Sequence, residues 1–309
     1  MATTPAFVDD PTFTALLEQL QQRLNNHVCC TLVYGSCLRS GDIYDGLLDL
    51  YLLVDSYRDA YAQRRLAAAN WLLPPNVFYA QQESAIKPVT LRSKVTVISL
   101  RDFERGCSPA WFESYLWGRF AQPTLVLGAR DEQVQDRVDR ALDTAAHTLL
   151  RRAIPQLPRS GTVIDLWEAA LTLSYGTELR TERTGRAGEL VEASRMFYHA
   201  LAAEHADALG LVLEGKTGDP DLSYRHSTGS WQARGNRIAW ATRRLQGKCL
   251  SIARLVKALF TFEGGLDYIA WKLERHSGEK IDIPERVRRR PLIHLWAFFW
   301  GLYRRGIFK

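Results

Sequence analysis

The sequence lacks the cysteine and histidine spacings that usually hold a zinc ion or a disulfide framework. Its 5 cysteines form an odd set without a C-x-x-C pair, and its 7 histidines include no H-E-x-x-H motif. The first residues also lack the apolar core of a secretory segment. We therefore expect a reduced, cytoplasmic protein without a structural or catalytic zinc ion.

A general excess of charge is missing as well. The formal net charge is +6, but the segment from Arg286 onward contains 7 basic residues and no acid. The rest of the chain then has 33 basic against 34 acidic residues and is close to neutral. Because such a body does not attract a polyanion, we expect no nucleic-acid partner.

Internal repeats and low-complexity tracts are also absent, and the composition is that of a folded protein. With 309 residues, 46% of them hydrophobic, the chain is long enough to form two domains with sizeable cores. Strand and helix patterns mix in the first half, whereas helical patterns dominate after Pro123. We expect an α+β fold.

Three apolar segments of the first half are expected to be strands. They are HVCCTLVYG, LLDLYLLVD and SKVTVISL. In the second, a side-chain period of two places Asp49, Tyr51, Leu53 and Asp55 on one face and only aliphatic side chains on the other. A helix is expected from Pro11, behind a cap at Asp10, and the Gly- and Ser-rich residues 215–230 are expected to form a loop.

Asp49 is the acid that most needs an explanation, because an isolated carboxylate among leucines is costly to bury. It can pair with a base, cap a neighbouring helix, or face a cleft where a cation binds. The preceding strand ends at Gly35-Ser36, a small turn that lets backbone amides approach a phosphate. We favour a metal ligand at Asp49.

The order of a strand, a Gly-Ser turn and an acid-bearing strand resembles the polymerase-β-like nucleotidyltransferases. Their usual pattern is GS followed by D-x-D, in which the acids hold Mg²⁺ on the nucleotide phosphates. This chain departs from the pattern, since Tyr51 stands where a second acid is expected and the third strand offers Lys94 and Thr96.

A narrower resemblance accounts for that departure. The segments YGSCLRS, LLDLYLLVD, KVTVIS, YLWGRFAQP and LSYGTELR follow the motif order of the mitochondrial-type phosphatidate cytidylyltransferases, the translocator assembly and maintenance family. Two differences remain, because Ala60-Tyr61 stands where the family has Trp-His and Thr96 replaces a Gly. Glu178 stands where the family has Asp, which keeps the charge.

Carried over position by position, this resemblance implies a set of site residues. The catalytic residues would be Asp49, Lys94 and Arg119, with Asp49 and Asp55 as metal ligands. The nucleotide-binding residues would be Tyr34, Gly35, Ser36, Ser174, Tyr175, Glu178 and Arg180.

The resemblance also implies the reaction and the domains. The enzyme would transfer CMP from CTP to phosphatidic acid with Mg²⁺, releasing pyrophosphate and forming CDP-diacylglycerol for phospholipid biosynthesis. A polymerase-β-like nucleotidyltransferase domain (1–130) would precede a mostly helical, winged-helix-like domain (131–250) and a C-terminal helical segment (251–309). Two alternatives stay open: nucleotidyl transfer to a different acceptor, and a non-catalytic, nucleotide-binding, membrane-associated protein.

The C-terminal tail predicts a contact with a membrane surface. Its apolar centre, residues 291–303, is shorter than the roughly 20 residues that span a bilayer. Basic clusters flank it, and Trp296, Trp300 and Tyr303 are of the types favoured at membrane interfaces. We expect an amphipathic anchor that keeps the protein peripheral on the inner, cytoplasmic face of a membrane; a helix docked on the protein or at a dimer interface is the alternative.

Overall fold

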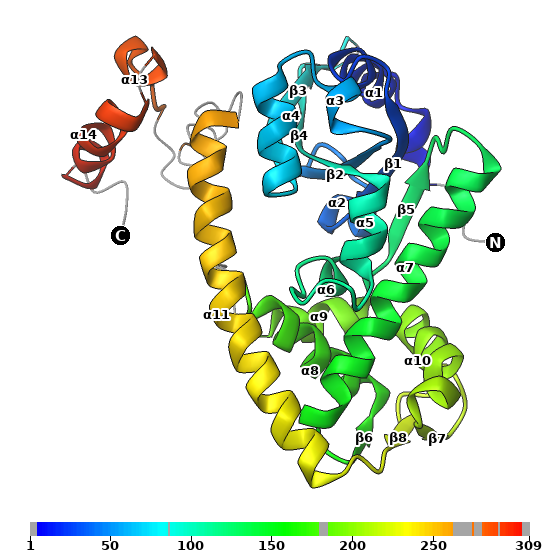
Figure 1. Cartoon of the computed structure of the whole chain (residues 1–309). Helices are drawn as coiled ribbons and strands as arrows, with labels where there is room; N and C mark the ends of the chain where they lie inside the picture. The colour runs from blue at the N-terminus through cyan, green and yellow to red at the C-terminus, as the bar shows by residue number, and fades with distance from the viewer. Residues whose placement is uncertain are drawn as a thin grey trace.

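A mixed five-stranded sheet lies in the upper lobe of the protein (Figure 1). The computed structural model describes residues 5–85, 87–178, 185–261, 274, 280–289 and 291–304. The sheet has the order β3-β4-β2-β1-β5, in which β2 and β4 run parallel and the other neighbours antiparallel. Its strands are β1 (Val28–Tyr34), β2 (Leu48–Val54), β3 (Asn76–Glu83), β4 (Thr90–Ser99) and β5 (Thr124–Leu127).

The alternation predicted for β2 is confirmed by the cores on its two sides. Leu48, Leu50, Leu52 and Val54 are buried in a core with α1 (Pro11–Arg23), whereas Tyr51 and Leu53 are buried in the core that includes α5 (Leu100–Cys107) and the first half of α7 (Glu132–Ala153). Burial of each such apolar side chain stabilises the folded state by about 1.5–3 kcal/mol. Asp49 is the one residue of β2 that is not fully buried.

Short helices connect and cover these strands. The predicted cap of α1 is confirmed, because the Asp10 carboxylate accepts a hydrogen bond from the Thr12 N–H at 2.8 Å. The short elements of the upper lobe are η1 (Ala6–Asp9), α2 (Ser36–Ser40), α3 (Tyr57–Ala60), α4 (Arg64–Leu72) and α6 (Trp117–Phe120).

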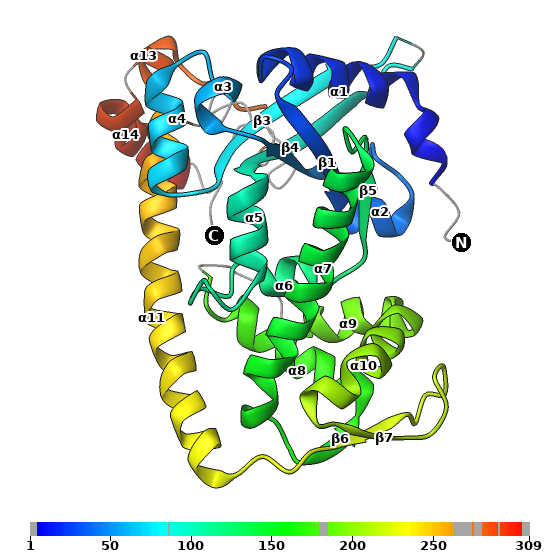
Figure 2. The ribbon, with the colours of Figure 1, turned by 45° about the vertical axis from the view of Figure 1, so that its right-hand side comes forward.

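The lower lobe is mostly helical and contains a small antiparallel sheet of order β6-β8-β7 (Figure 2). Its elements are η2 (Ile154–Gln156), β6 (Ser160–Thr162), α8 (Val163–Tyr175), α9 (Arg186–Ala193), α10 (Arg195–Leu209), β7 (Val212–Glu214) and β8 (Ser223–Arg225). Helix α7 belongs to both lobes: Val134 and Val138 lie in the upper core, and Leu149 and Leu150 in the lower one.

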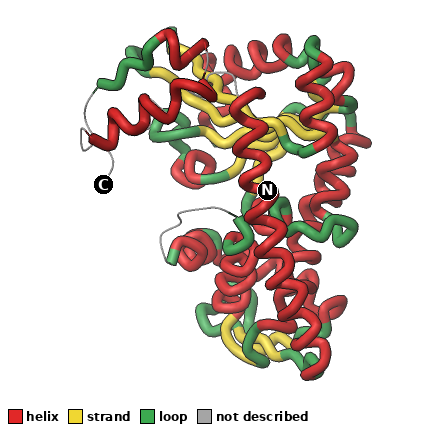
Figure 3. Tube along the Cα trace, turned by 60° about the vertical axis from the view of Figure 1, so that its left-hand side comes forward, coloured by secondary structure: helices red, strands yellow, loops and turns green. Residues whose placement is uncertain are grey.

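Helix α11 (Ser230–Thr261) runs along one side of the molecule from the lower lobe to the upper one (Figure 1). It contacts η2 at one end, and β3 and α4 near the other. The expected boundary at residue 250 therefore falls within a continuous helix. Figure 3 shows α13 (Glu285–Arg289) and α14 (Pro291–Arg304) near the upper lobe.

No helix in the described part of the chain is long and apolar enough to cross a membrane. Two strands of the five-stranded sheet, β3 and β5, were not expected from the sequence. In the lower lobe β6 and β7 were not expected either, and the loop predicted at 215–230 contains β8. Strand β5 is only four residues long and half-buried, so its backbone pairing with β1 depends on the tertiary fold more than on its own pattern.

Candidate functional site

Three residues on adjacent strands form one row across the sheet. In the strand register, Tyr34 at the end of β1 lies opposite Asp49 in β2, and Asp49 lies opposite Lys94 in β4. The antiparallel pairing of β1 and β2 brings the end of one strand to the beginning of the next. The sheet therefore places the Gly-Ser turn, the acid and the lysine next to one another.

Gly35 continues from Tyr34 with a backbone that suits glycine alone. Its φ of 92° and ψ of −157° lie in a region that residues with a Cβ avoid. A Cβ placed there would lie 3.0 Å from Oδ2 of Asp49. The turn is therefore in direct contact with the carboxylate, and Ser36 follows as the first residue of α2.

Lys94 pairs with Asp49, with 3.7 Å between its Nζ and Oδ1 of the carboxylate. The two side chains are 32% and 27% exposed, so water screens the pair and its contribution to folding is small. Both groups therefore remain available to a ligand. A phosphate could approach Lys94, and a cation could approach Asp49, without first opening a core.

The structure does not bring Asp55 to this site. Asp55 follows the other end of β2, where its carboxylate pairs with Arg130 at the surface. With a rise of roughly 3.3 Å per residue, six positions separate it from Asp49 by about 20 Å. The two carboxylates therefore cannot coordinate the same ion.

Arg119 is buried near Tyr34 and pairs with Glu178. Its Nη1 donates to the Tyr34 hydroxyl at 3.1 Å, and its Nη2 lies 3.0 Å from Oε2 of Glu178. Its Nε is buried without a hydrogen-bond partner among the described atoms. The structure thus joins three residues that the sequence had placed in one site. Arg180, the other predicted residue of that motif, lies outside the described residues.

Ser174 and Tyr175 hold the two lobes together at this point. Ser174 Oγ donates to the carbonyl of Ser114 at 2.9 Å, and the Tyr175 hydroxyl donates to the carbonyl of Gly118 at 3.4 Å. A Cβ on Gly118 would lie 2.6 Å from Ser174 Oγ, so the close contact requires glycine. In this structure the two residues position Arg119 from the neighbouring helix.

Tyr51 fills the position where the generic family pattern has a second acid. It is fully buried, and its ring packs edge-on against Phe120 with 4.9 Å between centroids. Its hydroxyl donates to that of Tyr115 at 3.4 Å. This position is therefore part of an aromatic core, and it offers no carboxylate to a metal.

Tyr115 and Arg254 also belong to this region, although neither is among the site residues predicted from the sequence. The guanidinium carbons of Arg119 and Arg254 lie 4.3 and 4.5 Å from the centre of the Tyr115 ring. Arg254 comes from α11 and also pairs with Glu113, with 2.9 Å between its Nη2 and Oε2 of the acid. No local pattern in the sequence links Tyr115 to an arginine 139 residues further along the chain.

Three basic side chains act on the Tyr115 hydroxyl. Burial on its own raises the pKa of the Tyr115 hydroxyl, but the positive charges of Arg119, Lys94 and Arg254 outweigh it and leave the pKa below its ordinary value. Because Lys94 is among these charges, the buried arginines and the row that contains Asp49 act on the same tyrosine. Each of the three bases is also paired with an acid, namely Glu178, Asp49 or Glu113.

The donor set decides how a metal ion could be held. Within the described ranges, no three His, Cys, Asp or Glu side chains form a group suited to a metal. Magnesium often takes one or two protein carboxylates and completes its shell with water and substrate phosphates. Asp49 therefore fits an Mg²⁺ ion that arrives with a nucleotide, and does not fit one held by the protein alone.

The arrangement can bind an anionic, metal-associated ligand. One carboxylate, one accessible lysine and a glycine turn lie together at the end of the sheet, backed by a buried arginine. A nucleoside triphosphate has the matching chemistry, since it brings both negative charge and oxygen ligands for the metal.

The sequence was also compared with models of known protein families and with curated proteins, and it matches none of them.

Proposed function

We propose that the protein is an Mg²⁺-dependent phosphatidate cytidylyltransferase, which transfers CMP from CTP to phosphatidic acid and releases pyrophosphate. The observation that carries the proposal is the row in which the Asp49 carboxylate lies between the Gly35 turn and Lys94. The order of motifs along roughly residues 30–180 supplies the choice of CTP and phosphatidate.

The reaction needs positioning and charge neutralisation more than a general base. An oxygen of the phosphatidate phosphate attacks the α-phosphorus of CTP. The bond from that phosphorus to its bridging oxygen breaks, and pyrophosphate leaves with the electron pair. The attacking phosphate is already an anion near neutral pH, so holding the two reactants in line is the main contribution of the protein.

Each residue of the row has a role in this proposal. Asp49 would hold Mg²⁺, and a bound ion would supply the charge neutralisation that the phosphates need. Lys94 binds the triphosphate as a mobile point charge, and Gly35-Ser36 lets the backbone and a hydroxyl approach it. Arg119, held by Glu178, donates a hydrogen bond to Tyr34 and so fixes the tyrosine at one end of the row.

The finer fold assignment is also a proposal. A Gly-Ser turn at the end of β1 and an acid in the antiparallel β2 support a polymerase-β-like nucleotidyltransferase domain. Helices with a small antiparallel three-stranded sheet support a winged-helix-like second domain. The C-terminal segment, in which Ile293 and Trp300 of α14 are 64% and 61% exposed, supports a peripheral position on the cytoplasmic face of a membrane.

The test is a transfer assay with purified full-length protein. CTP labelled on the α-phosphate is incubated with Mg²⁺ and phosphatidate dispersed in detergent. We expect label to move into the lipid phase, and an Asp49→Asn variant that folds normally to abolish the transfer. Label that stays in the aqueous phase with the unmodified protein would refute the proposal.

A non-catalytic nucleotide-binding protein is the second candidate. It is favoured by one observation, the buried Tyr51 in the position of the second acid. This candidate predicts Mg²⁺-dependent binding of CTP without turnover on phosphatidate. Transfer of label to a soluble acceptor instead would favour a nucleotidyltransferase with another substrate.

A further inference from the structure

The outer face of α11 carries a row of exposed apolar side chains. Trp231, Ile238, Leu245 and Ile252 follow one another every seven residues, and Val256 comes four residues later. Their exposed fractions are 80%, 65%, 68%, 52% and 51%. A seven-residue spacing keeps side chains on one side of an α-helix with only a slow drift. We call these five residues the outer row.

The opposite face of α11 is fixed to the protein. The Trp240 Nε1–H donates to the carbonyl of Arg152 at 2.7 Å, and the Arg243 Nε–H donates to that of Phe112 at 2.8 Å. A Cβ on Gly247 would lie 2.4 Å from the carbonyl oxygen of Thr177, so the helix packs closely there. These contacts fix the rotation of the helix, and the outer row faces away from both lobes.

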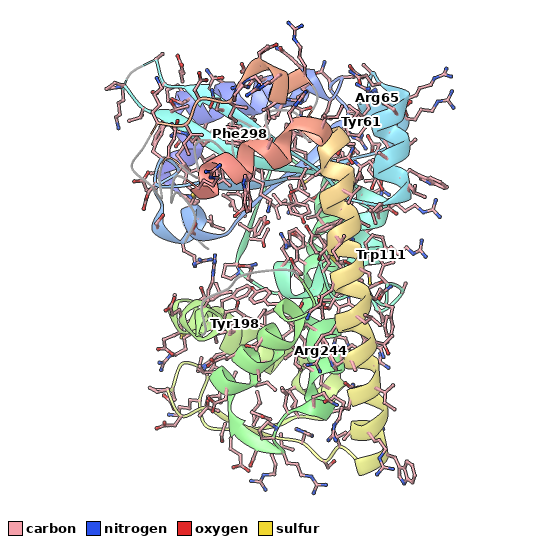
Figure 4. All side chains as sticks on the ribbon, turned by 90° about the vertical axis from the view of Figure 1, so that its left-hand side faces the viewer. Tyr61, Arg65, Trp111, Tyr198, Arg244 and Phe298 are labelled. Atoms are coloured by element: carbon pink, nitrogen blue, oxygen red, sulfur yellow. The ribbon has the colours of Figure 1, made fainter. Side chains whose placement is uncertain are left out.

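The charge of α11 has one sign only. Its sequence contains seven Arg or Lys residues and no Asp or Glu. Four of them, Arg234, Arg237, Arg244 and Lys248, are exposed. At 100° per residue they lie on one flank of the outer row. Figure 4 views α11 from its outer side, with Arg244 labelled on its lower half.

We propose that the outer row and its basic flank dock α11 onto an anionic membrane surface. Apolar side chains beside a line of bases are the pattern of a helix that lies in the headgroup region. A rod of 32 residues is about 48 Å long at ~1.5 Å per residue, which suits a flat partner. The proposal depends on α11 alone and holds whichever acceptor the active site uses.

The charges also argue against the other occupants. A second copy of α11 would bring its four exposed bases against the same four bases, and α11 contains no acid to pair them. Helix α14 contains no acid either. Helix α14, or α11 of a second copy, thus offers the basic flank no acidic partner, whereas anionic lipid attracts it by ~1 kcal/mol for each nearby base.

Cys249 gives a direct test. It lies four residues after Leu245, it is exposed, and the other four cysteines are buried. A polarity-sensitive thiol probe on Cys249 of the full-length protein is titrated with vesicles of phosphatidylcholine alone or with phosphatidylglycerol. We expect a blue shift with the anionic vesicles. As a control, the probe is moved to β7 in a Cys249→Ser/Val212→Cys variant, and no shift is expected.

Two sets of substitutions test the forces separately. Ile238→Gln/Leu245→Gln/Ile252→Gln removes apolar area, and Arg237→Gln/Arg244→Gln/Lys248→Gln removes charge. We expect each set to lower partitioning onto anionic vesicles at least tenfold in a sedimentation assay. Met196→Gln/Val212→Gln, exposed apolar residues on other elements, should leave partitioning unchanged.

Several outcomes would overturn this docking surface. Sedimentation with vesicles but without a shift at Cys249 would mean that another segment, such as the tail, binds the membrane. A blue shift without vesicles that grows with protein concentration would identify a second copy as the occupant. Equal binding to neutral and anionic vesicles would contradict the role of the bases. Loss of CMP transfer with an intact shift would refute the proposed reaction alone.

Discussion

Gly35 leaves open the space that the Asp49 carboxylate occupies. A Cβ at position 35 would lie 3.0 Å from Oδ2 of Asp49, and the backbone φ of 92° already excludes most side chains. The glycine turn and the acid are therefore one structural unit, although 13 residues separate them in the sequence.

A Gly35→Ala substitution should consequently damage both stability and activity. The backbone strain is expected to cost about 1–3 kcal/mol of unfolding free energy, and the new methyl group must displace the carboxylate. Urea unfolding and the CMP-transfer assay measure the two effects. Gly41→Ala is the matched control, because Gly41 has a φ of 72° but nothing within 4 Å of its missing Cβ. It should lose stability only; loss of transfer in both variants would contradict this explanation.

Lys94→Gln should weaken the binding of CTP without unfolding the protein. One hydrogen bond to a charged group contributes about 1.5–3 kcal/mol, which corresponds to a roughly 10- to 150-fold loss of affinity in titration calorimetry. The exposed pair with Asp49 should contribute less than about 1 kcal/mol to folding. Arg130→Gln breaks the surface pair with Asp55 at the other end of β2 and should leave CTP affinity unchanged. Equal affinities in all three proteins would remove Lys94 from the site.

Substitutions in the buried pair of Arg119 and Glu178 should cost much more folding stability than those in the exposed pair of Lys94 and Asp49. Their side chains are 3% and 10% exposed, so Glu178→Gln leaves a charge buried without its counter-ion and should cost about 3–5 kcal/mol. An Arg119→Met/Glu178→Gln double variant should lose less than the sum of the two single changes. Glu104→Gln, which breaks a one-third-exposed pair with Arg137, is the control and should cost under about 1 kcal/mol. Additive losses in the double variant would show that Arg119 and Glu178 are not coupled.

The cysteines should differ sharply in reactivity. Burial raises the pKa of Cys29 to about 11 and that of Cys30 to about 12, and the thiolate is the reactive form. Titration of the native protein with a thiol reagent at pH 8 should therefore modify one group, Cys249, and all 5 after unfolding. A Cys249→Ser variant should show none in the native state. Rapid modification of a second thiol would contradict the burial of the strand cysteines.

The same raised pKa values predict a loss of stability at high pH. Above pH 9 the unfolded chain releases the protons of Cys29 and Cys30, while the native state keeps them until about pH 11 and 12. Their contribution to stability is therefore fully present below pH 9 and is lost as the pH rises through that window. A Cys30→Ala variant should show a shallower decline of unfolding free energy between pH 9 and 11. If the unfolding free energy of the variant falls with pH as steeply as that of the unmodified protein, Cys30 does not contribute to the loss of stability.

Local patterns were sufficient for much of the fold. The cap of α1 at Asp10 and the alternation of β2 depend on residues a few positions apart, and both are confirmed. The four-residue strand β5 was not predicted, because its pairing with β1, and not its own composition, makes it a strand. The expected boundary at residue 250 was placed inside α11, since nothing in the local pattern distinguishes one long helix from two.

Local sequence was enough to single out an acid among leucines at Asp49 and a small turn at Gly35-Ser36. The neighbours of these residues depend on the three-dimensional fold. The strand register placed Lys94 beside Asp49 and left Asp55 at the far end, and the packing of two lobes brought Glu178 to Arg119. Side-chain periodicity is a local property of the chain, whereas strand order and helix packing depend on contacts between residues far apart in the sequence.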